Sequence, residues 1–329
     1  NIYIGSTTFS NDFPITAATF QPSYKGKQEG VVCKFDRTLS YLNWSSYLGG
    51  SNDEGIFSID INSYGDLYVT GGTTSSDFPV TSGAYRTQFN GGSADAFISC
   101  ISANGVNLKG STFWGSLSYD QGYFVRIGPD DEVYVFGQTK ASDSSMMIDA
   151  LYGQPNSGQF ISKFSPLLDE LRWSTVVGKG DGQPNISPTA FMVDVCGRIY
   201  YSGWGRIWGN SYVNGNWYLW GTPFGTHGLA VTPDAVQPIT DGQDFYIAIL
   251  SSEAAGLDYA TFFGEQHYSG CSFSGHDHVD GRGHAHGPPR AVGGTSATAS
   301  RPPPPQSAPP RPAENTAPRS RHPSVRQNA

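Results

Sequence analysis

The chain repeats itself about every 65 residues, and this period constrains its fold more than any other feature. The string DFPIT at 12–16 returns as DFPVT at 77–81. Three further strings recur with the same spacing, namely VVC at 31–33, YLG at 47–49 and DLYV at 66–69. A repeat of this length indicates an array of similar units, which must stack in order to bury their apolar faces.

Each unit has the pattern of β-structure. Short β-branched and aromatic runs are separated by clusters of Gly, Asn, Asp, Ser and Pro. The first unit contains four such runs, at 1–6, 30–36, 43–48 and 55–61. Gly and Pro interrupt nearly every stretch with helical spacing. We therefore expect an all-β fold, a partial or open β-propeller of about four blades with four antiparallel strands each, because such blades leave only short sheet edges.

The repeat also predicts the domain organisation. The units cover about 1–66, 67–132, 133–197 and 198–281. Residues 282–329 contain no Phe, Tyr, Trp, Leu, Ile, Met or Cys, and 11 of the 22 prolines lie there. Such a segment buries too little apolar area to offset its ordering entropy, so we expect a disordered tail. A frame-shifted gene end and a genuine proline-rich linker both explain it.

Composition limits the classes of partner. The net charge is −8, but the tail carries seven Arg and one Glu, which leaves residues 1–281 at −14. An acidic body repels phosphates, so nucleic acid is not an expected partner. No apolar run is long enough for a transmembrane segment. The four cysteines have no CxxC spacing, so no zinc site is predicted, and pairing of Cys196 with Cys271 stays open.

The period is interrupted once, by an insertion at 204–226. Asn214-Gly215 lies between apolar pairs there, which favours a two-residue hairpin. Loops on a rigid scaffold often carry recognition, and these aromatic residues have no repeat counterpart. The candidate binding residues are Trp204, Trp208, Tyr212, Trp217, Tyr218 and Trp220. Two interpretations stay open: an aromatic platform for a glycan or protein partner, or a flap that buries its own rings.

Recurring aromatic residues have a simpler interpretation. Trp44, Trp173 and Tyr259 share one column of the repeat. A second column contains Leu48, Trp114, Val177 and Phe263. A side chain that recurs at one strand position most simply fills the same layer of core, so we expect both columns to be buried.

Metal binding has weak candidates. Calcium prefers several oxygen ligands, and turns of the chain supply Asp53, Asp77, Asp241 and Asp244. Asp also favours turns through local hydrogen bonds, which is an alternative reason for its presence. The His-rich stretch 276–286 has metal-ligand residue types in a Gly-rich sequence without preformed geometry. No cofactor is firmly predicted.

Catalytic motifs are lacking. The sequence has no G-x-S-x-G, H-E-x-x-H or G-x-x-x-x-G-K-[ST] motif, and His227 is the only histidine before residue 267. We therefore expect a non-catalytic scaffold or adhesion module. The alternative is a carbohydrate-active enzyme that uses Asp or Glu carboxylates at the propeller channel. A structural spacer without a ligand is a third interpretation.

Several strings resemble known families. SDFPVTSGAYRTQFNGGSADAFIS at 76–99 resembles the SBBP-type β-propeller repeat of bacterial surface proteins. CGRIYYSGWG at 196–205, GLAVTPDAVQPITDGQDFYIAIL at 228–250 and LDYATFFG at 257–264 are similar to large gliding-motility-associated surface proteins of Bacteroidetes. This resemblance implies a secreted or outer-surface scaffold, exported by type IX secretion. It also implies a parent chain with further blades and PKD-like domains.

Overall fold

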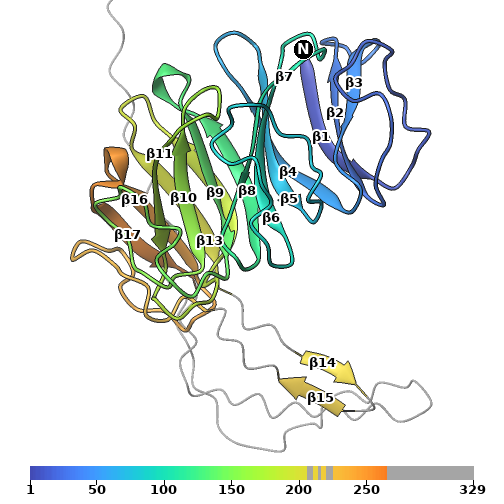
Figure 1. The fold of residues 1–329 in the computed structure, drawn as a ribbon. Coiled ribbons are helices and arrows are strands. Elements are labelled where there is room, and N and C mark those ends of the chain that lie inside the picture. Colours follow the sequence, from blue (N-terminus) through green and yellow to red (C-terminus); the bar gives the residue numbers. More distant parts are fainter. Residues whose placement is uncertain (206–209, 214–215, 220–224, 265–329) are drawn as a thin grey trace, which may run out of the picture. The chain divides into compact units, whose positions relative to one another are not determined.

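The computed structural model describes residues 1–205, 210–213, 216–219 and 225–264, which all belong to one compact unit, Asn1–Gly270. This part of the chain consists of antiparallel strands (Figure 1). The helical turns described in it, η1 (Pro129–Asp131) and η2 (Ser252–Ala254), have three residues each. No helix in these ranges is long and apolar enough to cross a bilayer.

The strands form four sheets that follow one another along the chain, and a separate hairpin. Sheet I contains β1 (Ile2–Thr8), β2 (Glu29–Phe35) and β3 (Leu42–Leu48). Sheet II contains β4 (Glu54–Ile61), β5 (Leu67–Thr73), β6 (Asp95–Ile101) and β7 (Leu108–Trp114). Sheet III contains β8 (Asp120–Ile127), β9 (Val133–Thr139), β10 (Gln159–Phe164) and β11 (Leu171–Val177). Sheet IV contains β12 (Ser187–Val193), β13 (Ile199–Trp204), β16 (Phe245–Leu250) and β17 (Leu257–Phe263), and the hairpin contains β14 (Asn210–Val213) and β15 (Asn216–Leu219).

The predicted all-β, propeller-like fold is confirmed, with one correction to the units. The sheets begin one strand earlier than the units 1–66, 67–132, 133–197 and 198–281. β4 lies inside the first predicted unit, yet it pairs with β5 of sheet II, and β8 and β12 show the same shift. The connections on either side of β4, 49–53 and 62–66, are both short, so the sequence pattern alone does not decide which neighbour it pairs with.

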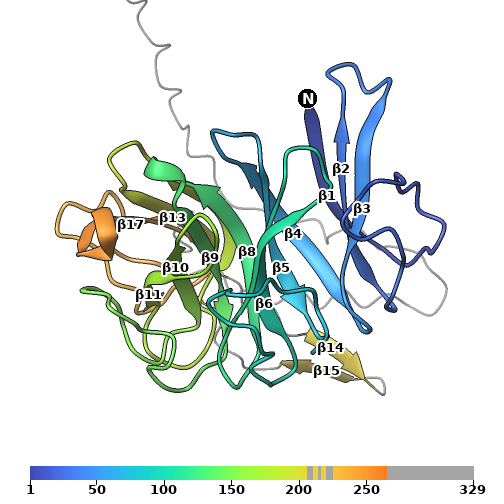
Figure 2. The ribbon, with the colours of Figure 1, turned by 45° about the horizontal axis from the view of Figure 1, so that its top comes forward.

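We call β4, β8 and β12 the leading strands, because each begins a four-stranded sheet. The leading strands of successive sheets lie next to one another, as Figure 2 shows for β4 and β8. Sheet I has three described strands and no leading strand among them, and its first strand, β1, contacts β4. This arrangement places the faces of neighbouring sheets against each other.

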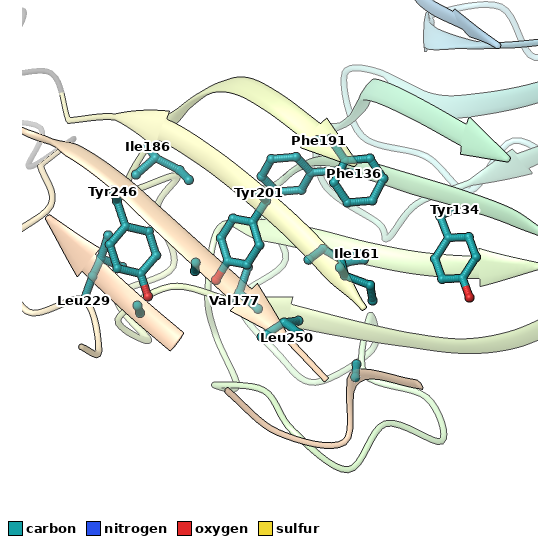
Figure 3. Packing of buried hydrophobic residues seen from close by; sticks show 14 of the residues in the cluster. Tyr134, Phe136, Ile161, Val177, Ile186, Phe191, Tyr201, Leu229, Tyr246 and Leu250 are labelled. Carbon is teal, nitrogen blue, oxygen red and sulfur yellow. The ribbon is translucent and has the colours of Figure 1, made fainter. Parts of the chain in front are cut away.

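The strand period of two directs alternate side chains to the two neighbouring sheets. In β6, Phe97 points into the cluster between sheets I and II, while Ile98 points into the cluster between sheets II and III. Between sheets III and IV, the Phe136 ring lies 5.5 Å from that of Phe191 and 5.4 Å from that of Tyr201 (Figure 3). Strands in the middle of the array are therefore buried on both faces.

The DFPxT strings explain the repeat at atomic level. They lie in the long connections between β1 and β2 of sheet I and between β5 and β6 of sheet II, and they bind the outer strand of the same sheet. The N–H of Thr16 donates to the carbonyl of Ser45 at 3.3 Å, and the N–H of Thr81 donates to that of Ser111 at 3.1 Å. The Ser111 hydroxyl donates to the carbonyl of Pro79 at 2.7 Å. The repeated string thus attaches the connection to its own sheet.

Candidate functional site

The insertion lengthens one connection of a repeated set. The second and third strands of sheets II and III are joined by 74–94 and 140–158, and the equivalent connection of sheet I, between β1 and β2, is 9–28; the three have similar lengths. In sheet IV the same connection runs from 205 to 244 and is about twice as long. The extra length contains β14 and β15. Sheet IV therefore carries an addition at a position where the other sheets have only the standard connection.

The standard connection is preserved beside the insertion. In sheet IV, the N–H of Thr232 donates to the carbonyl of Ala260 at 3.1 Å, which is the counterpart of the Thr81 to Ser111 bond in sheet II. The two ends of the insertion also lie together, because a Cβ atom built on Gly205 would be 2.9 Å from the backbone nitrogen of Thr226. The chain thus leaves and re-enters an intact framework.

The predicted hairpin is confirmed. β14 and β15 are antiparallel, and Val213 pairs with Asn216, which leaves a two-residue turn at 214–215. Tyr212 lies in β14, and Trp217 and Tyr218 lie in β15, where the backbone alone is described. Trp208 and Trp220 lie outside the described residues. The prediction of an aromatic platform or a flap therefore also falls outside them.

Trp204 begins an aromatic ladder across the end of sheet IV. It is the last residue of β13 and pairs with Phe245, the first residue of β16. Phe245 pairs in turn with Phe263, the last residue of β17. Directly opposed residues of antiparallel strands share a face, so the three side chains lie on one face of the sheet. Phe245 is 46% exposed and Phe263 is 65% exposed, and we call these three residues the aromatic ladder.

The ladder lies on a face that the other sheets cover. Ile98 in β6 and Ile161 in β10 are fully buried, because sheets III and IV pack over them. Ile247 occupies the same position in β16 and is 39% exposed. Within the described ranges, no further sheet comes after sheet IV. Phe245, Phe263, Ile247 and the half-exposed Met192 therefore form an open apolar face beside Trp204 and the insertion.

Sequence reasoning missed Phe245 and Phe263 as candidate residues. A signal for Phe245 was present, because the positions that match it in the other sheets hold Gly30, Ala96 and Gln159. Phe263 was placed in a buried column, and this expectation is wrong for Phe263, whereas Trp114 of that column is fully buried. The difference arises because no sheet among the described residues packs over sheet IV.

Two of the other recurring aromatic residues, Trp44 and Trp173, are core, as expected. Trp44 and Trp173 are almost fully buried, and Tyr259 of the same column is half-buried. The Trp44 indole donates to the carbonyl of Ala103 at 3.1 Å, and Ala103 lies in the turn between β6 and β7 of sheet II. The Trp173 indole donates to the Glu253 carboxylate at 2.8 Å. Both tryptophans thus connect neighbouring sheets.

The four candidate calcium ligands are not gathered into one site. Asp77 accepts the backbone N–H and the hydroxyl of Ser51, both at 2.9 Å, so it fixes the connection between sheets I and II. Asp241 accepts the N–H of Gln243 at 2.8 Å, and Asp244 accepts the Gln237 amide at 3.0 Å. Asp53 is exposed in the connection 49–53, where its backbone forms a bridge with Gln28. Within the part of the chain that is described, no three acidic, His or Cys side chains could hold an ion together. The His-rich stretch 276–286 and Cys271 lie outside the described residues.

Buried acids occupy the interfaces between sheets I, II and III. Asp95 begins β6 and Asp120 begins β8, and both are fully buried. One Asp120 oxygen accepts the N–H and the hydroxyl of Ser116, at 2.6 and 2.8 Å. One Asp95 oxygen accepts the N–H of Asn90. The second oxygen of each carboxyl has no hydrogen-bond partner among the described residues.

These surroundings favour the protonated acid. Burial raises the pKa of Asp95 to about 7, the N–H of Asn90 opposes the rise, the Asp120 charge adds to it, and the Arg86 charge opposes it. Burial also raises the pKa values of Asp120, Glu29 and Glu54. Glu29 and Glu54 occupy the matching positions between sheets I and II. Because these acids are fully buried, they are not the solvent-facing carboxyl pair that a carbohydrate-active enzyme would require.

The third interface replaces the acid pair with neutral residues. The positions that match Asp95 and Asp120 hold Gly158 and Ile186 there. The neighbouring Gln159 amide donates to the carbonyl of Ile186 at 3.0 Å, and its oxygen accepts the N–H of Asn185 at 3.2 Å. An amide thus supplies a donor where a carboxyl would need a proton, which indicates that the acids at the first two interfaces have a structural role.

No family model matches the sequence, and no curated protein matches it significantly.

Proposed function

We propose that this chain is a non-catalytic, propeller-like scaffold of a secreted or cell-surface bacterial protein, related to the SBBP-type repeats that it resembles. In this proposal, the open apolar face of sheet IV and the adjoining insertion bind a cell-surface glycan or a protein. The proposal rests mainly on one observation. The insertion is added to an intact connection, and it emerges beside the aromatic ladder.

The chemistry of the ladder suits recognition. Phe245 and Phe263 are half to two-thirds exposed, although a Phe at a strand position of this fold gains stability by burial. Exposed aromatic side chains on a rigid sheet lose little conformational entropy when they bind, and they are enriched in binding hot spots. The resemblance to gliding-motility-associated surface proteins implies the location and the adhesive role.

Truncation of two residues of the ladder should weaken binding without unfolding the protein. We expect the double variant Phe245→Ala/Phe263→Ala to lose at least tenfold in affinity, because each aromatic anchor contributes about 1–2 kcal/mol to a binding hot spot. Affinity electrophoresis through gels that contain cell-surface polysaccharide measures glycan binding. Biolayer interferometry against outer-surface protein fractions measures protein binding.

The matched control is Tyr64→Ala. Tyr64 is 79% exposed in the turn after β4, far along the chain from the ladder. We expect this variant to bind like the unaltered protein. Full binding by the double variant Phe245→Ala/Phe263→Ala would contradict the proposed surface. Whichever of the two assays detects binding by the unaltered protein decides whether the partner is a glycan or a protein.

A further inference from the structure

One edge of β1 is not paired with any strand in the described part of the chain. In sheets II, III and IV, the second strand lies between a leading strand and a third strand. β1 occupies the same place in sheet I, yet it pairs only with β2 among the described residues. Ile4 matches Val69 and Val135, which are fully buried, but Ile4 is 42% exposed. None of the described strands therefore covers the edge of β1 in the way that β4 and β8 cover the edges of β5 and β9.

A hollow of about 270 Å³ lies at this edge. It is lined by residues of β1 and β4, namely Tyr3, Ile4, Gly5, Phe57, Ser58 and Ile59. We call this hollow the β1 slot. In sheet II, the equivalent space beside β5 is occupied by β4, which pairs with β5 along its whole length. Sheet II thus shows that a leading strand fills such a space.

The end of β1 next to the slot has a hydroxyl group that can bind an acid. In sheet II, the Thr73 hydroxyl donates to the Glu54 carboxyl at 2.7 Å while it accepts the N–H of Ser75 at 2.9 Å. Thr8 occupies the position of Thr73, and its hydroxyl accepts the N–H of Ser10 at 3.0 Å in the same way. The Thr8 hydroxyl can therefore donate to an acidic residue that begins an added strand.

The bulged residue of each leading strand defines a second requirement. The register of β4 shifts at Phe57, and that of β8 shifts at Tyr123. Such bulges redirect a side chain out of the strand alternation. The Phe57 and Tyr123 rings stack at 5.7 Å with an angle of 27° between their planes. Phe57 is still 50% exposed, so it can stack on a further bulged aromatic ring from an added strand.

We propose that β1 binds an additional antiparallel strand in the β1 slot, and that this strand has the pattern of β4. Its first residue is acidic and lies opposite Thr8, and its fourth residue is an aromatic ring that lies on Phe57. The occupant is an extended segment of a further repeat unit. Backbone hydrogen bonds to β1 supply affinity, and the acid and the ring supply register. This inference does not depend on the proposed function of sheet IV.

The test uses the full chain and a fluorescent peptide with the sequence of residues 52–63, NDEGIFSIDINS. We expect saturable binding by fluorescence anisotropy, together with slower amide exchange in β1. A peptide with Gln in place of its Glu should bind at least fivefold more weakly. Thr8→Val and Phe57→Ala should weaken binding of the original peptide to a similar extent, whereas Thr38→Val in an exposed turn should leave it unchanged.

Three outcomes would overturn the inference. The first is absence of binding at millimolar peptide. The second is equal binding of the original, Gln-containing and scrambled peptides. The third is a dimer of the chain that persists with excess peptide and disappears in an Ile4→Pro variant, because a second copy would then occupy the edge.

Discussion

Replacement of Trp114 by alanine is expected to lower the free energy of unfolding by about 3–5 kcal/mol. Trp114 ends β7 and is fully buried between sheets II and III. Its ring lies 5.6 Å from that of Phe164 and 6.5 Å from that of Phe160, both in β10 of the next sheet. The Arg86 guanidinium lies 5.3 Å from the centre of the same ring. Truncation would leave a cavity in a rigid interface, and chemical denaturation monitored by circular dichroism measures its cost.

Phe263→Ala is the matched control for this prediction. Phe263 occupies the column of Trp114 in sheet IV, but its side chain faces solvent. We expect its truncation to cost less than about 1 kcal/mol, because little apolar area is lost. Equal costs at the two positions would show that burial between sheets does not stabilise this fold.

The second large effect is a loss of stability as pH rises. The pKa of buried Asp95 is raised from 3.8 to about 7, so the folded state retains its proton where the unfolded chain releases it. The stabilising contribution is therefore fully present below pH 3.8 and declines until pH 7. It amounts to about 4 kcal/mol between these limits.

Asp95→Asn isolates this contribution, because an amide keeps the shape and a donor without titrating. The unfolding free energy of the variant, measured by denaturant titration from about pH 4 to about pH 8, should fall less than that of the unaltered protein. The difference between the two proteins should grow with pH across this window. Asp258→Asn, at an exposed position of β17, should keep the slope of the unaltered protein. Parallel curves for Asp95→Asn and the unaltered protein would refute the assignment.

The repeat made the fold predictable, except for the phase of the sheets. The four runs of the first unit correspond to β1, β2, β3 and β4. Spacing identifies strands and their order, but the period is the same wherever the cut between units is placed. The pairing of β4 with β5 depends on tertiary contact, which a single sequence pattern does not encode.

The candidate site was predictable where the repeat failed. Trp204 and the hairpin were recognised because they have no counterpart in the other units. Phe263 escaped because its column is core in three sheets, and its exposure depends on the absence of a covering sheet among the described residues. The buried acids escaped because Asp and Glu beside Gly and Asn have the composition of a turn, whereas Glu29, Glu54, Asp95 and Asp120 are buried between sheets. The sequence pattern thus identifies strands, but it does not show whether the residues at the strand ends are buried or exposed.

Excision of the insertion tests the central claim most directly, namely that stacked sheets supply stability while an added segment supplies recognition. Gly205 and Thr226 lie together in the structure, so residues 206–224 can be removed and Gly205 joined to Gly225 without moving β13 or β16. Calorimetry and binding are then measured on the same sample. The account predicts an unfolding temperature within about 3 °C of the original protein and loss of partner binding. Unfolding of the shortened chain, or undiminished binding, would contradict it.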